Sequence, residues 1–360
     1  MGSTSRAGRE REETSGVEYR PLLFSIAYGM TGSVGDSEDL VQDALLGLTR
    51  ARRAGTVVED PKAYLARAVT RLGINYLRSA RVRRETYVGE WLPEPVVVPG
   101  TASGTGEGPA EHAELADSLS MAFLVLLEAL SPVERAVFML REVFGYAHAD
   151  VAEIVGRTEV NCRQIFARAR QRVRAGVRAR EGLAPEPARR AECDELARRF
   201  FQAAAGGDVT ALLGMLAPDV VVTGDGGGKA LAFARPVVGR ERAARLLLNG
   251  FRWLLTNGLV IQPARVNGGP GAVLYDGEGR VISVTELDMT DGVIQAVRSV
   301  TNPDKLGHLG PVSTAARRVD RRPKVFDDAW DAIPHDATGH DATGRESGRE
   351  SGRGGPRREE

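Results

Sequence analysis

LSPVERAVFMLREVFGYAHADVAEIVGRTEVNCRQIFARARQRVR, residues 130–174, has the residue spacing of a helix-turn-helix. This motif needs a small residue where two helices cross, a glycine in the turn, and apolar residues that dock the second helix. The four positions that meet these needs are Ala152, Gly156, Cys162 and Ile165. We therefore expect a second helix over residues 159–174, in which Cys162 is a small buried hydrophobe rather than a reactive thiol.

The second helix of this motif would expose side chains that suit DNA. Arginine binds guanine edges or phosphates, and asparagine and glutamine bind adenine. The predicted DNA contacts are Asn161, Arg163, Gln164, Arg168 and Arg172. Residues 157–180 carry eight arginines and one glutamate, which favours a nucleic-acid partner. An ordinary helical hairpin with a solvated arginine face is the alternative.

Capping residues and apolar spacing mark the helices before the motif. Ser131 suits an N-cap, Pro132 suits the first helical position, and Glu134 can close a capping box. Apolar residues recur at spacings of three and four from Leu119 to Leu130, as on one face of an amphipathic helix. These signals predict a helical domain around the motif.

Zero net charge, from 48 basic and 48 acidic residues, conceals strong local charge. Residues 62–84 contain seven basic side chains and no acidic one, so a helix there can lie along phosphates. A compact acidic cluster precedes it, formed by Asp36, Glu38, Asp39 and Asp43. Basic helices and an acidic helix in one chain predict two kinds of partner.

Composition also excludes several classes of protein. No apolar run approaches the roughly 20 residues of a membrane span, and the polar N-terminus does not have the pattern of a secretory signal. We therefore expect a cytoplasmic protein that contacts no membrane. Cys162, Cys193 and five dispersed histidines predict neither a disulfide framework nor a metal site, and no cofactor is expected.

The length of 360 residues and the changes in composition predict a multidomain chain. The segment GTASGTGEG (100–108) is typical of a flexible linker, and the repeats after residue 307 are typical of disorder. Residues 191–306 combine two helical stretches with five strand-like runs, which predicts an α+β domain. The expected divisions are a disordered N-terminus (1–16), a helical domain (17–90), a linker (91–114), a second helical domain (115–182), a short linker (183–190), an α+β domain (191–306) and a disordered tail (307–360).

Three long segments together resemble the sigma-70 family of RNA polymerase sigma factors, of the extracytoplasmic-function (ECF) type. YRPLLFSIAYGMTGSVGDSEDLVQDALLGLTRAR (19–52) and DPKAYLARAVTRLGINYLRSARVRRE (60–85) are similar to the two halves of sigma region 2. Residues 130–174 are similar to region 4, although His148 and Ala149 depart from the usual pattern, an aromatic or serine followed by an acid. The resemblance implies two all-α sigma domains, no catalytic residues, and promoter-specific initiation with core RNA polymerase.

The resemblance also implies a role for each half of region 2. The first half would bind the clamp of the largest polymerase subunits through Asp36, Glu38, Asp39, Gln42 and Asp43. The second half would read and melt promoter DNA, and melting needs groups that stack on or hydrogen-bond an unstacked base. The candidates there are Arg71, Asn75, Tyr76, Arg78, Arg81, Arg83 and Arg84.

Three short strings resemble the subgroup of ECF sigma factors that is fused to a SnoaL-like C-terminal domain. They are WLPEP (Trp91, Leu92, Pro93, Glu94, Pro95), DGGGK (Asp225, Gly226, Gly227, Gly228, Lys229) and NPDKL (Asn302, Pro303, Asp304, Lys305, Leu306). The resemblance implies an α+β cone that regulates the sigma domains in cis through contacts at these strings. Taken alone, WLPEP is equally consistent with a plain linker, and DGGGK with a hairpin turn.

Two other functions remain open at this point. Relatives of SnoaL-like domains include isomerases and cyclases, but residues 190–306 contain no histidine, and Asp225, Asp288 and Tyr275 are not joined by any spacing that compels a shared site. A pocket in such a cone could still take a small ligand. A helix-turn-helix regulator fused to such a domain is the alternative, but it leaves the acidic helix and the acid-free helix unexplained.

Overall fold

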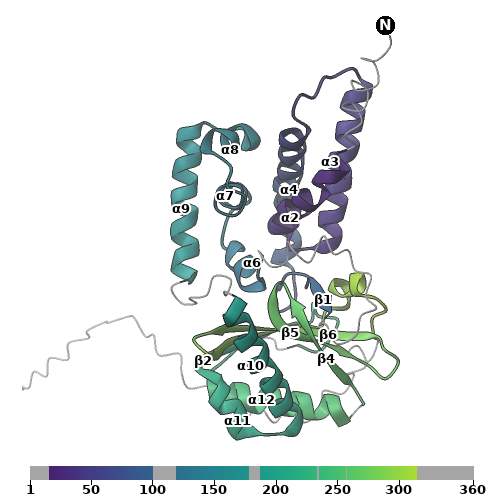
Figure 1. Cartoon of the computed structure of the whole chain (residues 1–360), viewed down its shortest axis with the longest axis vertical. Helices are drawn as coiled ribbons and strands as arrows, with labels where there is room; N and C mark the ends of the chain where they lie inside the picture. Colours follow the sequence, from purple (N-terminus) through teal and green to yellow (C-terminus); the bar gives the residue numbers. More distant parts are fainter. Residues whose placement is uncertain (1–15, 100–118, 178–186, 233–234, 257, 314–360) are drawn as a thin grey trace, which may run out of the picture.

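The computed structural model describes residues 16–99, 119–177, 187–232, 235–256 and 258–313. The linker GTASGTGEG and most of the two segments expected to be disordered lie outside the described residues. Figure 1 shows two helical domains side by side at one end of the molecule and a sheet with its own helices at the other. The expected order of two all-α domains followed by an α+β domain is therefore confirmed.

The first helical domain follows the short 3-10 helix η1 (Val17–Tyr19). It consists of α2 (Arg20–Thr31), α3 (Val34–Arg53) and α4 (Pro61–Glu85). Pro21 lies in the first turn of α2, where its missing N–H costs no hydrogen bond. Ser33 caps α3 and accepts a hydrogen bond from the Asp36 N–H, at 3.2 Å. The three helices pack on one another, and the apolar face of α2 is buried between α3 and α4.

The second helical domain consists of four α-helices and one π-helical turn. They are α6 (Met121–Leu127), α7 (Pro132–Phe138), η2 (Met139–Val143), α8 (His148–Val155) and α9 (Glu159–Val177). The predicted capping box at Ser131 and Glu134 is present at the start of α7. Gly156 ends α8 in the left-handed conformation, with φ +68°, and Cys162 and Ile165 of α9 are buried. The predicted helix-turn-helix is therefore α8 and α9.

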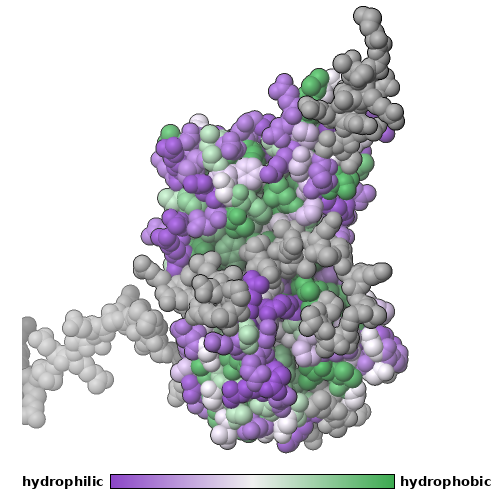
Figure 2. Space-filling model, viewed as in Figure 1, coloured by the Kyte–Doolittle hydropathy of each residue, from purple (hydrophilic) through white to green (hydrophobic). Residues whose placement is uncertain are grey.

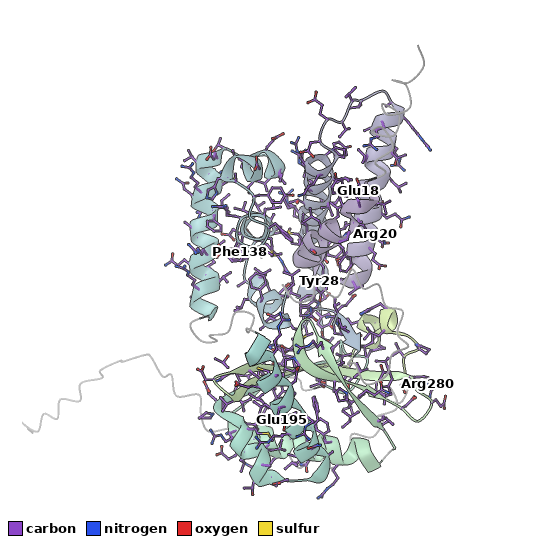
Figure 3. All side chains as sticks on the ribbon, in the orientation of Figure 1. Glu18, Arg20, Tyr28, Phe138, Glu195 and Arg280 are labelled. Atoms are coloured by element: carbon purple, nitrogen blue, oxygen red, sulfur yellow. The ribbon has the colours of Figure 1, made fainter. Side chains whose placement is uncertain are left out.

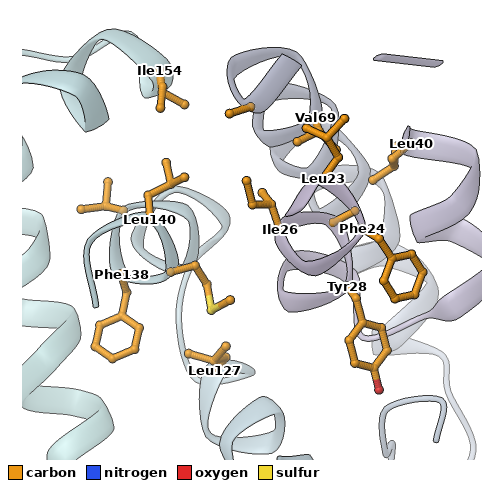
Figure 4. Packing of buried hydrophobic residues seen from close by; sticks show 14 of the residues in the cluster. Leu23, Phe24, Ile26, Tyr28, Leu40, Val69, Leu127, Phe138, Leu140 and Ile154 are labelled. Carbon is orange, nitrogen blue, oxygen red and sulfur yellow. The ribbon is translucent and has the colours of Figure 1, made fainter. Parts of the chain in front are cut away.

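A shared apolar core joins the two helical domains. Figure 4 shows Leu23 and Ile26 of the first domain on one side of this core, and Leu140 and Ile154 of the second domain on the other. All four side chains are buried. Burial of apolar side chains contributes about 1.5–3 kcal/mol each, so this contact stabilises a closed arrangement of the two helical domains.

The C-terminal domain has three helices and a seven-stranded sheet. Its elements are α10 (Pro187–Gly206), α11 (Val209–Met215), β2 (Leu216–Asp225), β3 (Val237–Val238), α12 (Arg240–Thr256), β4 (Val260–Val266), β5 (Gly269–Tyr275), β6 (Val281–Thr290) and β7 (Val293–Val300). The strand order is β1-β4-β5-β6-β7-β2-β3, and β2 and β7 are the parallel pair in an otherwise antiparallel sheet. The edge strand β1 (Val97–Pro99) comes from the segment between the helical domains, so part of the predicted linker belongs to this sheet.

The two faces of the sheet bury different partners. Alternate residues such as Leu287 and Val297 pack against α10, α11 and α12, while Val284 and Val300 form a second cluster on the opposite face. That second cluster includes Leu92 and Met121, which lie outside the C-terminal domain in the sequence. The sheet is therefore covered on one face by its own helices, while α6 and the segment that contains Leu92 pack against the other.

The chain continues past the position where the sequence predicted the tail to begin. After the 3-10 turns η3 (Pro303–Lys305) and η4 (Gly307–Leu309), Val312 forms a bridge to Val281. The Ser313 hydroxyl donates to Asp276 Oδ2 at 2.6 Å. The predicted boundary at residue 307 was therefore too early, because these residues add hydrogen bonds to the start of β6.

Candidate functional site

The three short strings converge on one buried carboxylate, that of Asp225 at the end of β2. Lys305 Nζ lies 2.7 Å from Asp225 Oδ2, and the Leu92 N–H donates to the same oxygen at 2.8 Å. The Tyr87 hydroxyl donates to Oδ1. Asp225 is fully buried and Lys305 nearly so. A buried charge must be paired and hydrogen-bonded. Here DGGGK supplies the carboxylate, NPDKL supplies the paired cation, and WLPEP and Tyr87 supply hydrogen-bond donors.

The Lys305 ammonium is enclosed by the segment that joins the helical domains. Its nitrogen lies 4.2 Å from the centre of the Trp91 ring and 5.0 Å from that of Tyr87. The same nitrogen also donates to the Leu92 carbonyl. Cation–π contacts of this kind strengthen when they are desolvated. Lys305 therefore binds both the WLPEP string and the DGGGK string.

Tyr87 is the residue of this cluster that sequence reasoning missed. Besides its bond to Asp225, its hydroxyl accepts a hydrogen bond from Asn302 Nδ2 at 2.8 Å. Burial, together with the hydrogen bond to Asp225, raises the pKa of Tyr87 well above its usual range, so the hydroxyl stays protonated and donates. An aromatic residue four positions before Trp91 was the available signal, but nothing in the local pattern pointed to Asp225.

The glycines of DGGGK allow Asn302 and residues 87 and 88 to approach the turn closely. A Cβ added to Gly227 would lie 2.2 Å from Asn302 Nδ2 and 3.0 Å from the Tyr87 hydroxyl oxygen. A Cβ on Gly228 would lie 3.1 Å from Val88 Cβ. Lys229, next in the string, forms an exposed ion pair with Asp304. The turn is therefore both a loop at the end of β2 and a packing surface for residues 87–92.

We expect Gly227→Ala to destabilise this contact more than the backbone alone requires. Gly227 has φ +57°, and Gly207, with φ +74°, has nothing within 4 Å of its added Cβ. Gly207→Ala is therefore a matched control for backbone strain. The clash at Gly227 should lower the free energy of unfolding by about 1–3 kcal/mol beyond that control, measured by chemical denaturation. Equal losses in the two variants would contradict the packing role.

Glu94 connects WLPEP to the first helical domain. Its carboxylate accepts hydrogen bonds from the Ser33 hydroxyl at 2.9 Å and from the Val34 N–H at 2.7 Å, both at the start of α3. Its own N–H donates to the Gly32 carbonyl at 2.8 Å. A carboxylate at a helix N-terminus satisfies free N–H groups and complements the helix dipole. WLPEP thus binds both the C-terminal domain and the helix that carries the acidic cluster.

The remaining residues of WLPEP and NPDKL are mostly buried. Leu92 and Leu306 pack in the cluster on the face of the sheet opposite α10, α11 and α12, and Pro93 and Pro303 are also buried. The Pro95 carbonyl accepts a hydrogen bond from His308 Nε2 at 2.8 Å. The strings therefore form a docked surface in this structure, in contrast to a solvated linker.

The predicted polymerase-binding residues lie together on α3. Glu38, Asp39, Gln42 and Asp43 are exposed, and they leave an acidic surface available to a partner. Asp36 differs, because its carboxylate accepts a hydrogen bond from the Tyr76 hydroxyl of α4 at 2.5 Å. The structure thus joins a residue predicted to bind polymerase to one predicted to bind promoter DNA.

The predicted DNA-binding face of α4 lies partly against the helix-turn-helix. Arg71 Nε donates to the Ile154 carbonyl at 3.1 Å, and its Nη2 to the Glu153 carbonyl at 3.4 Å, at the C-terminal end of α8. Arg67 forms an ion pair with the Glu153 side chain. Asn75 and Arg78 are exposed. The side chains of Arg81, Arg83 and Arg84 fall outside the described residues.

The predicted recognition helix α9 presents most of its candidate residues to solvent. Figure 2 shows hydrophilic surface over the helix-turn-helix, along one edge of the helical end of the molecule. Arg163, Gln164 and Arg168 are exposed, while Asn161 is half-buried. Two arginines have acidic neighbours, since Arg163 lies 2.6 Å from Glu159 and Arg172 lies 2.7 Å from Glu134. Such surface pairs are weak, so phosphates can replace them.

One buried arginine links the two helical domains directly. Arg135 of α7 donates from Nε to the Gly29 carbonyl of α2 at 2.9 Å and forms an ion pair with Glu128 at 2.5 Å. Sequence reasoning did not single it out, because an arginine in the first turns of a capped helix has the pattern of a surface residue. Its burial shows that the closed arrangement has polar contacts as well as an apolar core.

Within the described ranges, no group of three or more His, Cys, Asp or Glu side chains is placed to hold a metal ion. None of the helices that the structure describes is long and apolar enough to cross a membrane.

Sequence families match the two helical domains. Sigma-70 region 2 matches residues 17–83, which hold α2, α3 and most of α4. Sigma-70 region 4 matches residues 120–173, which hold the helix-turn-helix. The fold and these two matches define a sigma-70-type transcription initiation factor.

Comparison with known proteins extends the similarity to the C-terminal domain. The chain is 39% identical over 294 residues to the ECF RNA polymerase sigma factor SigJ of Mycobacterium tuberculosis, covering 79% of this chain and 90% of SigJ. It is 31% identical to the probable ECF sigma factor SigI of the same species, over 81% of this chain and 93% of SigI. The crystal structure of SigJ superimposes with a TM-score of 0.63 at 34% sequence identity, over 81% of this chain and 96% of that one. The chain belongs to the ECF RNA polymerase sigma factors.

Proposed function

We propose that this sigma factor is regulated in cis by its C-terminal domain, which controls the arrangement of regions 2 and 4. The observation that supports this most directly is the convergence of the three strings on the Asp225–Lys305 pair. That pair belongs to the C-terminal domain but is completed by Tyr87, Trp91 and Leu92, in the segment between the two sigma regions. A domain that grips this segment can bias the distance between the regions it connects.

The surfaces for polymerase and DNA follow from the exposed residues. The acidic face of α3 would bind the clamp of the largest polymerase subunits, where basic surface complements it. Arg163, Gln164 and Arg168 of α9 would contact promoter DNA, and Asn75 and Arg78 of α4 would contact the melted element.

The closed arrangement restricts some of these groups. Arg71 is held by carbonyls of α8, across the contact between regions 2 and 4. The Tyr76 hydroxyl is held by Asp36 of α3, within region 2. A DNA strand that used Arg71 would have to replace the two carbonyls of α8. We infer that regions 2 and 4 separate before α4 engages promoter DNA, and that the C-terminal domain stabilises the form that precedes this separation.

The C-terminal domain acts in this proposal as a regulator without catalysis. Asp225 is committed to its pair with Lys305, and Asp288 Oδ2 lies 2.9 Å from Arg298, which is also 2.8 Å from Glu286. Carboxylates whose oxygens are occupied by a paired cation are poorly placed to abstract a proton from a substrate. The proposal also requires no small ligand, although a ligand that altered the sheet would alter the docked strings with it.

In vitro transcription with purified core polymerase tests the sigma assignment for the full chain. We expect the chain to co-elute with core enzyme and to let it start RNA at specific sites in a library of promoter fragments. A helix-turn-helix regulator would instead bind duplex DNA and leave core enzyme unable to select a start site. Absence of both co-elution and specific starts would overturn the proposal.

A further inference from the structure

The turn between β4 and β5 reaches into the junction of the two sigma regions. Asn267 lies in this turn with φ +51° and is 1% exposed. Its Nδ2 donates to the Tyr28 hydroxyl at 2.8 Å and to the Leu119 carbonyl at 3.2 Å. Its Oδ1 accepts from the Val96 N–H at 3.1 Å, and its own N–H donates to the Val96 carbonyl at 2.8 Å. One side chain therefore uses both of its amide hydrogens and its oxygen.

The partners of Asn267 belong to three different parts of the chain. Tyr28 is on α2 of region 2, Val96 follows WLPEP, and Leu119 immediately precedes region 4. The Tyr28 hydroxyl donates in turn to the Glu94 carbonyl at 2.6 Å. Burial raises the pKa of Tyr28 far above its usual range, so this hydroxyl remains a donor. Figure 3 places Tyr28 at the end of the helical domains that faces the sheet.

Asparagine is the side chain that this position requires. A backbone with positive φ is sterically unfavourable for most residues, and glycine, asparagine and aspartate tolerate it best. Glycine would lose the side-chain bonds, and aspartate would turn an oxygen toward the Tyr28 oxygen and the Leu119 carbonyl. A buried donor or acceptor left without a partner costs more than the hydrogen bond itself contributes.

We propose that the Asn267 turn is a second clamp, separate from the Asp225–Lys305 pair, that fixes region 2 to the start of region 4. The inference rests on the proposed regulation in cis. Strands β5, β6 and β7 lie between β4 and β2 in the sheet, so the two contacts are at different places. The Asp225–Lys305 pair contacts residues 87–92, whereas Asn267 contacts α2 of region 2 and the residue that immediately precedes region 4.

The test measures the distance between the two sigma regions in the full chain. Fluorophores are attached to cysteines introduced at two exposed positions, Thr49→Cys on α3 and Gln171→Cys on α9. Cys193 is replaced by serine so that it is not labelled, and Cys162 is kept because it is buried. Energy transfer is recorded for the parent chain, Asn267→Asp, Tyr28→Phe and the double variant. Asp291→Asn is the matched control, because Asp291 has a similar left-handed backbone, with φ +53°, in the exposed β6–β7 turn.

We expect Asn267→Asp to lower the ratio of closed to open chains about tenfold, and Asp291→Asn to leave that ratio unchanged. Tyr28→Phe should open the chain less than Asn267→Asp. The effects of the two changes should add only in part, because both remove the bond between Asn267 and Tyr28, while each also removes one bond of its own. Unchanged distances in Asn267→Asp, or strictly additive effects in the double variant, would overturn the clamp. If circular dichroism shows that Asn267→Asp does not fold, Tyr28→Phe alone is the test. An unchanged distance in Tyr28→Phe would then overturn the proposal.

Transcription by the parent chain keeps this inference distinct from the proposed function. If the parent chain directs specific starts but Asn267→Asp does not open it, the clamp fails and the sigma function stands. If Asn267→Asp opens the chain but neither it nor Asp225→Asn changes transcription, the clamp stands and the regulation in cis fails.

Discussion

Asp225→Asn is expected to release residues 87–92 from the C-terminal domain and to change transcription more than any other single substitution in this domain. The variant keeps the size of the side chain but leaves the Lys305 ammonium buried without its counter-charge. Removing one partner of a buried pair costs about 3–5 kcal/mol, which is more than a hundredfold in the equilibrium between docked and released forms. The Tyr87 hydroxyl would also lose the charged oxygen that accepts its hydrogen bond.

Hydrogen exchange at the Leu92 N–H measures this release directly, because that N–H donates to Asp225 in the docked form. Lys229→Met is the matched control. It removes an ion pair of the same two strings, but each partner of the pair keeps 55% of its side-chain surface exposed. Such a pair contributes about 0–1 kcal/mol, so exchange should hardly change. Similar acceleration in Asp225→Asn and Lys229→Met would contradict a special role for the buried pair.

A double variant separates the loss of the pair from the loss of a charge. Asp225→Asn with Lys305→Met removes both charges, so no buried ion is left alone. We expect it to dock better than Asp225→Asn by itself, although the contacts of Lys305 with Leu92 and the Trp91 ring are lost. Compared with Asp225→Asn alone, the double variant should show a smaller change in transcription and slower hydrogen exchange at the Leu92 N–H.

Local signals predicted the helical domains well, because caps and turns are decided by residues within one or two helical turns. The capping box at Ser131 and the turn at Gly156 are present where the sequence placed them. Helix α12 was missed, although Ala243, Ala244 and Leu247 have the spacing of an apolar helix face.

The sequence named the three strings as contact segments, but it did not predict which of their residues contact one another. Resemblance selected the three strings, yet no spacing rule joins Asp225 to Lys305, which is 80 residues further along the chain. Tyr87 and Asn267 lie outside the strings and show their role only when the sheet brings their partners together. The sequence predicts a linker at strand β1, because three valines between prolines show no alternation of apolar and polar residues. The pairing of β1 with β4 depends on the docked sheet.

Charge reversal at Arg163 and Arg168 is expected to weaken promoter binding by the complex with core polymerase by about 100-fold or more. Each arginine that contacts a base or phosphate is worth about 1–3 kcal/mol, and glutamate at either position would repel the phosphates. The plot of log affinity against log salt concentration should become shallower by about 2, because two phosphate contacts are lost. Fluorescence anisotropy of labelled promoter DNA across a salt series measures both quantities.

Arg242→Glu with Arg245→Glu is the control for net charge. Both residues are exposed on α12, and Arg245 follows Glu241 by one helical turn, as Arg163 follows Glu159. The control therefore makes the same change in total charge on a similar helix surface, but in the C-terminal domain. If the two double variants lost affinity equally, long-range charge would explain the effect, and α9 would not be the helix that reads the promoter. A loss of affinity confined to the Arg163 and Arg168 variant would locate promoter recognition on α9. The two double variants change the net charge equally, so a difference between them reflects short-range contacts with DNA.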